Sequence, residues 1–199
     1  MANHSSLMEQ LAAEPLLQSR MQGKRLTKGV HIIRQNQVMT DLFIIQRGLV
    51  KLYYVTPDGK EWVKSFVAEG EAFGSRTCQI TGEGSPFAAV CLEDTDIVAL
   101  PYAVFRSVLL DRPKLIETVL QLTEAIGLKK ERREYELLCR TAEERYRMFH
   151  HEQPELARRL SQMDIARYLG ITPIALSRIK KRVSAERQAV MPKAHTGLS

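Results

Sequence analysis

Between residues 26 and 100, apolar and polar positions follow the pattern of β-strands. The segments richest in Val, Ile, Phe and Tyr are GVHIIRQ, DLFIIQRGLVKLYYV, EWVKSFVAE and FAAVCLEDTDIVAL. Glycine, proline and Asn or Asp residues separate them, as turns between strands require. Between two of these segments Pro57 precedes Asp58-Gly59, which favours a tight hairpin turn. Short strands at this spacing predict a sandwich or barrel.

After residue 101 the apolar positions recur with a helical period. Leu115, Val119, Leu122 and Ile126 are spaced 4-3-4, which predicts the apolar seam of a long amphipathic helix over about residues 113–138. Such a seam can pack on its own domain or on the same helix of a second copy. The periodicity alone leaves both alternatives open.

The segment SQMDIARYLGITPIALSRIKKR, residues 161–182, predicts two short helices joined by a tight turn. Ser161 with Asp164 three residues later resembles a capping box, so the first helix is expected to start at about Gln162. Gly170 permits the positive φ of the turn.

The second helix is expected to begin with Thr172 as its cap and Pro173 as its first residue. At that position the missing N–H of proline costs nothing. Five apolar residues are expected to face a shared core: Ile165, Ala166, Leu169, Leu176 and Ile179. The small Ala166 lets the helices cross closely, which is the layout of a helix-turn-helix.

The outer face of the second helix is polar and basic. It carries Thr172, Pro173, Ile174, Ser177, Arg178 and Lys181. A face of this kind fits the major groove of DNA. A helical hairpin with a solvated basic face is the alternative.

Charge favours the first interpretation. The net charge is +6, and the last 39 residues contain seven basic and two acidic residues, so they carry +5. A concentration of this kind suits a polyanionic partner. From about Val183 onward no alternating strand pattern is present, and this tail is expected to be poorly ordered.

Other features exclude several classes of function. No run of about 18 apolar residues and no secretory pattern is present, which predicts a cytoplasmic protein. Cys78, Cys91 and Cys139 form no CxxC pair and are expected to be buried or half-buried thiols. The pair His150-His151 has no metal-spaced partner and is expected to be solvated. No nucleophile, base and acid group together, so neither an enzyme nor a metal site is predicted.

Over nearly its whole length, the chain resembles the Crp/Fnr family of transcription regulators. KGVHIIRQNQVMTDLFIIQRGLVKLYYVTPDGKE is similar to the family's cyclic-nucleotide-binding β-roll, with Gly29, Asp41, Gly48 and Gly59 at its turns. YLGITPIALSRI is most similar to the subgroup whose recognition motif is YLGITPxxLSRI.

The resemblance implies an α+β fold with three parts. These are a β-roll sensor domain of jelly-roll type at 1–112, a dimerisation helix at 113–140 and a helix-turn-helix DNA-binding domain at 141–199. It therefore favours pairing of two copies through the apolar seam. It also implies double-stranded DNA and RNA polymerase as partners. Members of the family usually have a wing, a two-stranded hairpin after the recognition helix. The corresponding segment here, VSAERQAVMPKAHTGLS, has no strand pattern, so a wing is not expected.

The family's effector motifs are altered here. Binders of cAMP carry Gly-Glu after a Phe to hold the ribose, whereas this chain has Phe73, Gly74, Ser75 and then Arg76. The Arg-Ser pair that holds the cyclic phosphate falls on Ser85-Pro86. On the long helix Lys130 and Glu131 stand where the family contacts adenine.

Without its arginine the phosphate loses its strongest contact, so cAMP is not expected to bind in the usual manner. Arg76 could substitute, but it is expected to be a surface residue at a strand end. The six residues from Phe73 to Arg76 and Ser85-Pro86 remain the candidate pocket for an unknown small-molecule effector.

Two functions of different classes follow. In the first, a DNA-binding dimer uses Arg178 to read a guanine edge and Ile174 to touch a thymine methyl, while phosphates are positioned by Gln162, Thr172, Ser177 and Lys181. In the second, an effector-sensing β-roll carries a helical tail that binds protein. The salt dependence of DNA binding discriminates between them.

Overall fold

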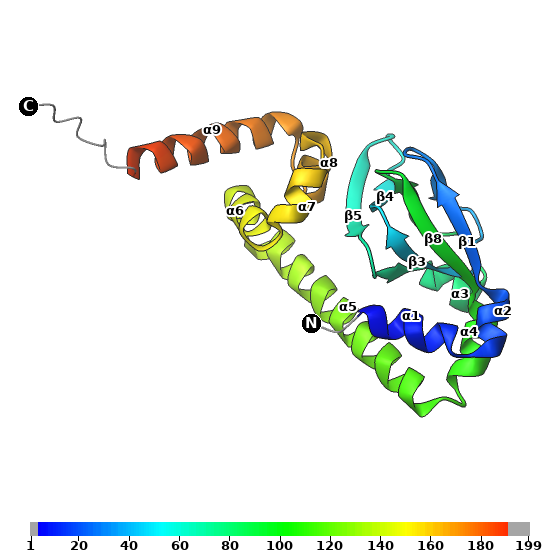
Figure 1. Cartoon of the computed structure of the whole chain (residues 1–199). Coiled ribbons are helices and arrows are strands. Elements are labelled where there is room, and N and C mark those ends of the chain that lie inside the picture. Colours follow the sequence, from blue (N-terminus) through cyan, green and yellow to red (C-terminus); the bar gives the residue numbers. More distant parts are fainter. Residues whose placement is uncertain (1–3, 191–199) are drawn as a thin grey trace, which may run out of the picture. The chain divides into compact units, whose positions relative to one another are not determined.

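The structure, a computed structural model, describes residues 4–190 of the chain. The chain divides between Arg133 and Glu134 into two compact units (Figure 1). The first combines strands with helices and the second is helical. The predicted mixed α+β fold is therefore confirmed.

Two four-stranded sheets form the centre of the first unit. One has the order β1-β8-β3-β6 and the other β2-β7-β4-β5, with every pair antiparallel. Their bounds are β1 Gln22–Leu26, β2 His31–Ile33, β3 Asp41–Arg47, β4 Val50–Val55, β5 Glu61–Val67, β6 Ala72–Phe73, β7 Ala88–Cys91 and β8 Thr95–Pro101. Strands distant in sequence are neighbours, as in the predicted roll. Phe43, Val50, Phe73, Phe87 and Ile97 belong to the core of this roll.

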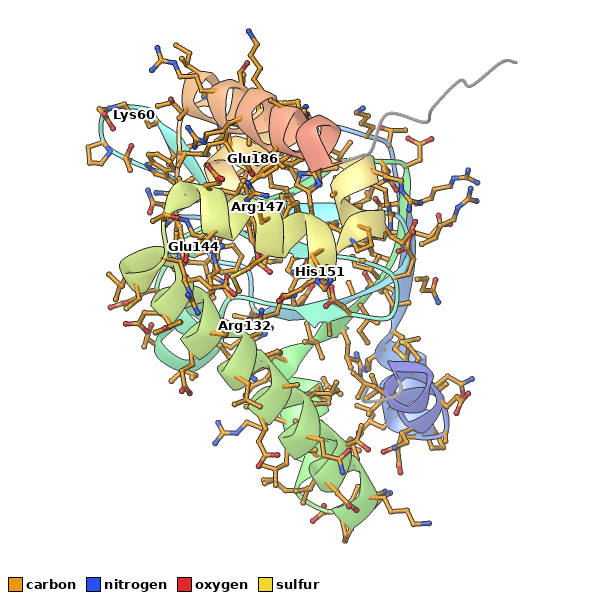
Figure 2. The ribbon with its side chains drawn as sticks, turned by 90° about the vertical axis from the view of Figure 1, so that its left-hand side faces the viewer. Lys60, Arg132, Glu144, Arg147, His151 and Glu186 are labelled. Carbon is orange, nitrogen blue, oxygen red and sulfur yellow. The ribbon has the colours of Figure 1, made fainter. Side chains whose placement is uncertain are left out.

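The predicted hairpin turn is confirmed between β4 and β5. Gly59 has a φ of 77°, and the Thr56 N–H donates to the carbonyl of Lys60 at 2.9 Å. The Lys60 ammonium lies 2.6 Å from the Asp58 carboxylate at the tip of the hairpin (Figure 2).

Three helices pack together with the first turns of a long helix, α5 (Pro113–Cys139). The three are α1 His4–Ala12, α2 Pro15–Arg20 and α4 Tyr102–Leu109. Leu115 joins Leu7, Leu11, Ile44 and Phe105 in a second core, against which Val119 and Leu122 also pack. Ile126, in contrast, is 45% exposed.

Three of the four residues of the predicted seam therefore pack within their own unit. Helix α1 supplies apolar partners for this face of α5, so these three residues follow the first of the two alternatives, packing on their own domain, and not the pairing that the resemblance favoured. Because α1 precedes α5 by a hundred residues, the spacing within α5 could not reveal this packing.

The second unit contains α6 Ala142–Glu152, α7 Pro154–Arg159, α8 Gln162–Tyr168 and α9 Pro173–Val190. The expectation of poor order from Val183 is wrong for residues 183–190, which continue α9. Val183 is 5% exposed and anchors this extension in the core. Helix α9 occupies the described part of the predicted tail, and residues 191–199 lie outside the described residues.

Three smaller expectations are corrected. Arg76 begins the short helix α3 (Arg76–Thr81) and is not at a strand end, because Ser75 caps a helix there. Cys139 is exposed, whereas Cys78 and Cys91 are buried as expected. His150 is half-buried, since its ring packs 4.4 Å from that of Tyr146.

Within residues 4–190, no cluster of His, Cys, Asp or Glu side chains has the arrangement of a metal site. No helix of that part of the chain is long and apolar enough to span a bilayer.

Gly48, in the turn between β3 and β4, provides a test of the roll. Its φ is 102°, and a Cβ would lie 2.6 Å from Thr95 Oγ1 and 2.7 Å from the Asp94 carbonyl oxygen. Gly48→Ala is therefore expected to lower the free energy of unfolding by about 3 kcal/mol. Urea denaturation followed by fluorescence of the single tryptophan, Trp62 on β5, measures this.

Gly59→Ala is the matched control, since φ is also positive there but no atom lies within 4 Å of the added Cβ. It is expected to cost only about 1–2 kcal/mol. Equal losses in the two variants would mean that the close approach at Gly48 is not what constrains this turn.

Candidate nucleic-acid interface

The turn between α8 and α9 has the geometry that the sequence predicts. Ser161 Oγ accepts the Asp164 N–H at 3.1 Å and caps α8. Gly170 has a φ of 70°, and the Ile171 N–H donates to the Ala166 carbonyl at 3.0 Å. This bond closes a Schellman motif, which satisfies a free carbonyl at the end of α8 and reverses the chain.

Helix α9 begins as predicted. Thr172 Oγ1 accepts the Ala175 N–H at 3.2 Å, and Pro173 is the first helical residue. The predicted inward residues of both helices are buried: Ile165, Ala166, Leu169, Leu176 and Ile179 are all at most 5% exposed. The two helices therefore share one core, as the spacing indicated.

All seven side chains predicted to contact DNA are exposed. They are Gln162 on α8, the cap Thr172, and Pro173, Ile174, Ser177, Arg178 and Lys181 on α9. Gln162, Pro173, Ser177 and Lys181 line a groove of about 500 Å³ between the two helices. The structure thus brings most of the predicted contact residues to one surface.

Lys180 is an addition that the sequence analysis did not single out. Its ammonium donates to Gln162 Oε1 at 2.7 Å and links α9 to the start of α8. It also lines the groove, together with Ser184 one turn further along α9. The spacing Ser177, Lys180, Lys181, Ser184 places these residues on one helical face and was the available signal.

Arg145 on α6 supports the turn from behind. Its Nε donates to the carbonyl of Leu169 at 3.0 Å, and Nη1 donates to the carbonyl of Arg140 at 2.5 Å. A guanidinium at these carbonyls satisfies acceptors at the ends of α8 and α5. No sequence pattern announces this role, because the partners are backbone atoms.

An ion-pair network joins α6 to the distal half of α9. Glu143 accepts from Arg147 at 2.7 Å and also from Arg182, while Arg147 donates in addition to Glu186. Figure 2 shows Arg147 and Glu186 close to one another. Hydrogen bonds from Arg147 and Arg182 hold the pKa of Glu143 below its usual range.

In the roll, the candidate effector residues are engaged in structure. Ser75 and Ser85 are fully buried. Ser75 Oγ accepts the Cys78 N–H at 3.4 Å, and Ser85 Oγ donates to the Phe87 carbonyl at 2.7 Å. Both hydroxyls are therefore engaged in hydrogen bonds with nearby backbone atoms.

The other four candidates lie around this pair. The Phe73 ring stacks on that of Phe43 at 5.2 Å, and a Cβ on Gly74 would lie 2.5 Å from Gln79 Nε2. Arg76 is exposed and its Nη1 lies 3.5 Å from the hydroxyl of Tyr102, while Pro86 is also exposed. Aromatic rings and backbone contacts thus occupy much of this region.

Comparison with known proteins agrees with this architecture. Residues 23–112 match the family model of the cyclic nucleotide-binding domain. The fumarate and nitrate reduction regulatory protein of Vibrio cholerae is 28% identical over 174 residues, which are 80% of this chain and 67% of that protein. The nitrogen fixation regulation protein FixK of Bradyrhizobium diazoefficiens is 25% identical over 98% of this chain and 85% of its own.

The fold comparison covers both units. The structure of FixK2 from Bradyrhizobium japonicum superposes with a TM-score of 0.73 at 20% identity, and the match covers 89% of each chain. These matches support kinship with regulators of the Crp/Fnr type. The relatives that match this chain over most of its length are transcription regulators.

The network between α6 and α9 generates a testable prediction. Glu143→Gln removes the charge that holds Arg147 and Arg182, so the distal half of α9 should open more often. Amide hydrogen exchange at residues 183–190 is expected to become several-fold faster at pH 7. In the wild type the protection factors of the same amides should fall on acidification, as Glu143 is protonated, because its pKa is lowered in the folded state and the ion pairs are lost below it.

Glu155→Gln is the matched control, since it removes the exposed 2.8 Å ion pair with Arg158 on α7 and does not touch α9. If exchange at 183–190 changed equally in both variants, or in neither, the network would not be what holds the extension of α9.

Proposed function

We propose that this chain acts as a homodimeric, sequence-specific DNA-binding transcription regulator. The exposed face of α9 carries the proposal: the Schellman turn buries the apolar side of the helix and leaves Thr172, Ile174, Ser177, Arg178 and Lys181 outside. The concentration of positive charge in the last 39 residues supports a polyanionic partner. The kinship with transcription regulators supports DNA as that partner.

The roles along α9 follow from side-chain chemistry. Arg178 has the bidentate donor geometry that matches O6 and N7 of guanine, and Ile174, 68% exposed, offers an apolar contact for a thymine methyl. Lys181, Ser177, Thr172 and Gln162 are proposed to contact phosphates. Lys180 orients Gln162 through their hydrogen bond.

The homodimer is proposed to form through a stripe of α5 one residue removed from the predicted seam. Ile116, Leu120, Thr123 and Gly127 recur at 4-3-4 spacing and are exposed. Ile116 and Leu120 are 40% and 54% exposed, beside the stripe that packs on α1. A Cβ on Gly127 would meet no atom within 4 Å, so a second helix can approach closely there.

Two further parts of the proposal rest on the similarity to Crp/Fnr regulators. Regulators of this family bind DNA and act as dimers, and a regulator that works on transcription has RNA polymerase as a natural partner in the cytoplasm.

Binding of cAMP in the family's usual manner is not proposed, since the hydroxyls of Ser75 and Ser85 form hydrogen bonds with backbone atoms. A helical unit that binds another protein is the alternative, which weak salt dependence of DNA binding would favour.

Two substitutions on α9 test the assigned roles. Arg178→Ala is expected to cost roughly 1–3 kcal/mol on the operator and to relax preference at one base pair in each half-site. Lys181→Ala should weaken all sequences alike and reduce the salt slope by about one unit for each lost phosphate contact. Titrations of operator and scrambled duplex at several salt concentrations measure both effects.

The operator should contain two half-sites about 34–36 Å apart, because a two-fold dimer presents its recognition helices to successive major grooves. Equal losses on operator and scrambled duplex for Arg178→Ala would make Arg178 a phosphate contact. The reading role would then pass to Thr172, Ile174 or Ser177.

The dimer is tested on the exposed stripe. Leu120→Glu places a charge in the proposed interface without touching the core below α1, so the protein should become monomeric in light scattering. Ile126→Glu, at the open end of the predicted seam, should have a similar effect. Leu110→Glu is the control, since Leu110 is 70% exposed but lies outside α5. A monomeric wild type, or a dimeric Leu120→Glu variant, would contradict the proposed interface.

A further inference from the structure

We propose that Ile174 and Arg178 together read one step of the operator, a guanine beside a base pair whose pyrimidine carries a 5-methyl group. This inference rests on the proposed DNA-binding function and adds a chemical preference to it. The methyl group can belong to thymine or to 5-methylcytosine. Methylation of a cytosine at this position is therefore expected to strengthen binding, which would make the affinity of such an operator depend on DNA methylation.

Ile174 is an apolar residue on the otherwise polar and basic face of α9, two residues after the cap Thr172. Its side chain is 68% exposed, and among residues 141–186 the only other large apolar side chain on the surface is Met163 on α8, at 49%. A β-branched side chain in a helix keeps one preferred χ1 rotamer. Ile174 therefore presents a fixed methyl surface, and its burial against a ligand costs less side-chain entropy than that of a long flexible residue.

Arg178 follows Ile174 by one helical turn and is also exposed. Residues four apart on a helix share a face, with Cβ atoms about 5–6 Å apart. Successive base pairs lie about 3.4 Å apart, so two side chains at this spacing reach neighbouring base pairs. Among residues 4–190, no acceptor pairs with the Arg178 guanidinium, whereas Arg182 one turn further is held by Glu143. The donors of Arg178 are thus available for O6 and N7 of guanine.

The first two turns of α9 hold no carboxylate or carboxamide, since the stretch from Thr172 to Arg178 contains no Asp, Glu, Asn or Gln. A cytosine amine therefore finds no carboxylate there, and an adenine finds no bidentate amide. Gln162 on α8 has a carboxamide, but its Oε1 already accepts from Lys180. Hydroxyls such as that of Ser177 can donate or accept, so they distinguish bases weakly. Apolar contact with a pyrimidine methyl group is the discriminating chemistry that remains.

Thymine and 5-methylcytosine present the same apolar group to the major groove. In both bases the methyl group is attached to C5 of the ring, beside the hydrogen-bonding edge. The two bases differ at C4, where thymine has an oxygen acceptor and cytosine has an amino donor. The side chain of Ile174 forms hydrogen bonds with neither group, so its contact responds to the methyl group. We therefore expect thymine to bind more tightly than uracil, and 5-methylcytosine more tightly than cytosine.

Binding of base analogues to the full chain tests the inference. An operator is selected from randomised duplexes, and the guanine whose preference is lost in Arg178→Ala is identified. The thymine expected in a neighbouring base pair is then replaced by uracil, cytosine or 5-methylcytosine. Uracil is expected to bind about fourfold more weakly than thymine, and 5-methylcytosine about fourfold more tightly than cytosine, which is the effect of one buried methyl group. Uracil at thymines elsewhere in the half-site should leave the affinity unchanged.

Variants show whether Ile174 is the source of the methyl effect. Ile174→Ala should bind the thymine and uracil duplexes equally, because the methyl group then has no apolar partner, and the four affinities form a double-mutant cycle. Met163→Ala is the matched control, since it removes an exposed apolar side chain from α8 and should keep the difference between the two duplexes. Persistence of the methyl effect in Ile174→Ala, or its loss in Met163→Ala, would overturn the assignment to Ile174.

The outcomes separate this inference from the proposed function. If operator and scrambled duplex bind equally, or if neither binds, sequence-specific DNA binding fails and the inference fails with it. The inference alone fails if the selected operator has no thymine in either base pair beside the guanine read by Arg178, or if Arg178→Ala relaxes no guanine. It also fails alone if the operator is preferred but thymine and uracil bind equally, or if 5-methylcytosine binds no more tightly than cytosine.

Discussion

The close crossing of α8 and α9 is the constraint on which the proposed DNA-binding surface depends. It requires a small side chain at Ala166 and a positive φ at Gly170, so that the Ile171 N–H reaches the Ala166 carbonyl. Once the chain reverses there, Leu176 and Ile179 have no place other than the core shared with Ile165. The exposed face of α9 is the geometrical consequence of this packing.

The far half of α9 is also held in place by contacts with the rest of its unit. Val183 returns to the core one turn after Ile179, and Glu143 and Arg147 on α6 hold Arg182 and Glu186. Burial and ion pairs together support the helix as it continues to Val190, in a segment where the sequence showed no strand pattern for a wing. The far half of α9 is thus held by residues outside the proposed DNA-binding face.

In the roll and in α5, some faces are covered by packing and others are exposed. Rings of Phe43, Phe73 and Phe87 fill the roll where the altered effector motifs begin. On α5, the stripe of Leu115, Val119 and Leu122 packs against α1, whereas the adjacent stripe that begins at Ile116 is exposed. In both cases a neighbour distant in sequence decides which residues remain available.

The sequence by itself determined the helix-turn-helix, because capping residues, Gly170 and apolar spacing act over a few residues. It also determined the strands and hairpin of the roll and the existence of α5. Only the tertiary structure decided that Leu115, Val119 and Leu122 pack on α1 and that α9 continues past Val183. These depend on contacts between distant segments, and local patterns of polarity carry no information about which segment will cover a given face.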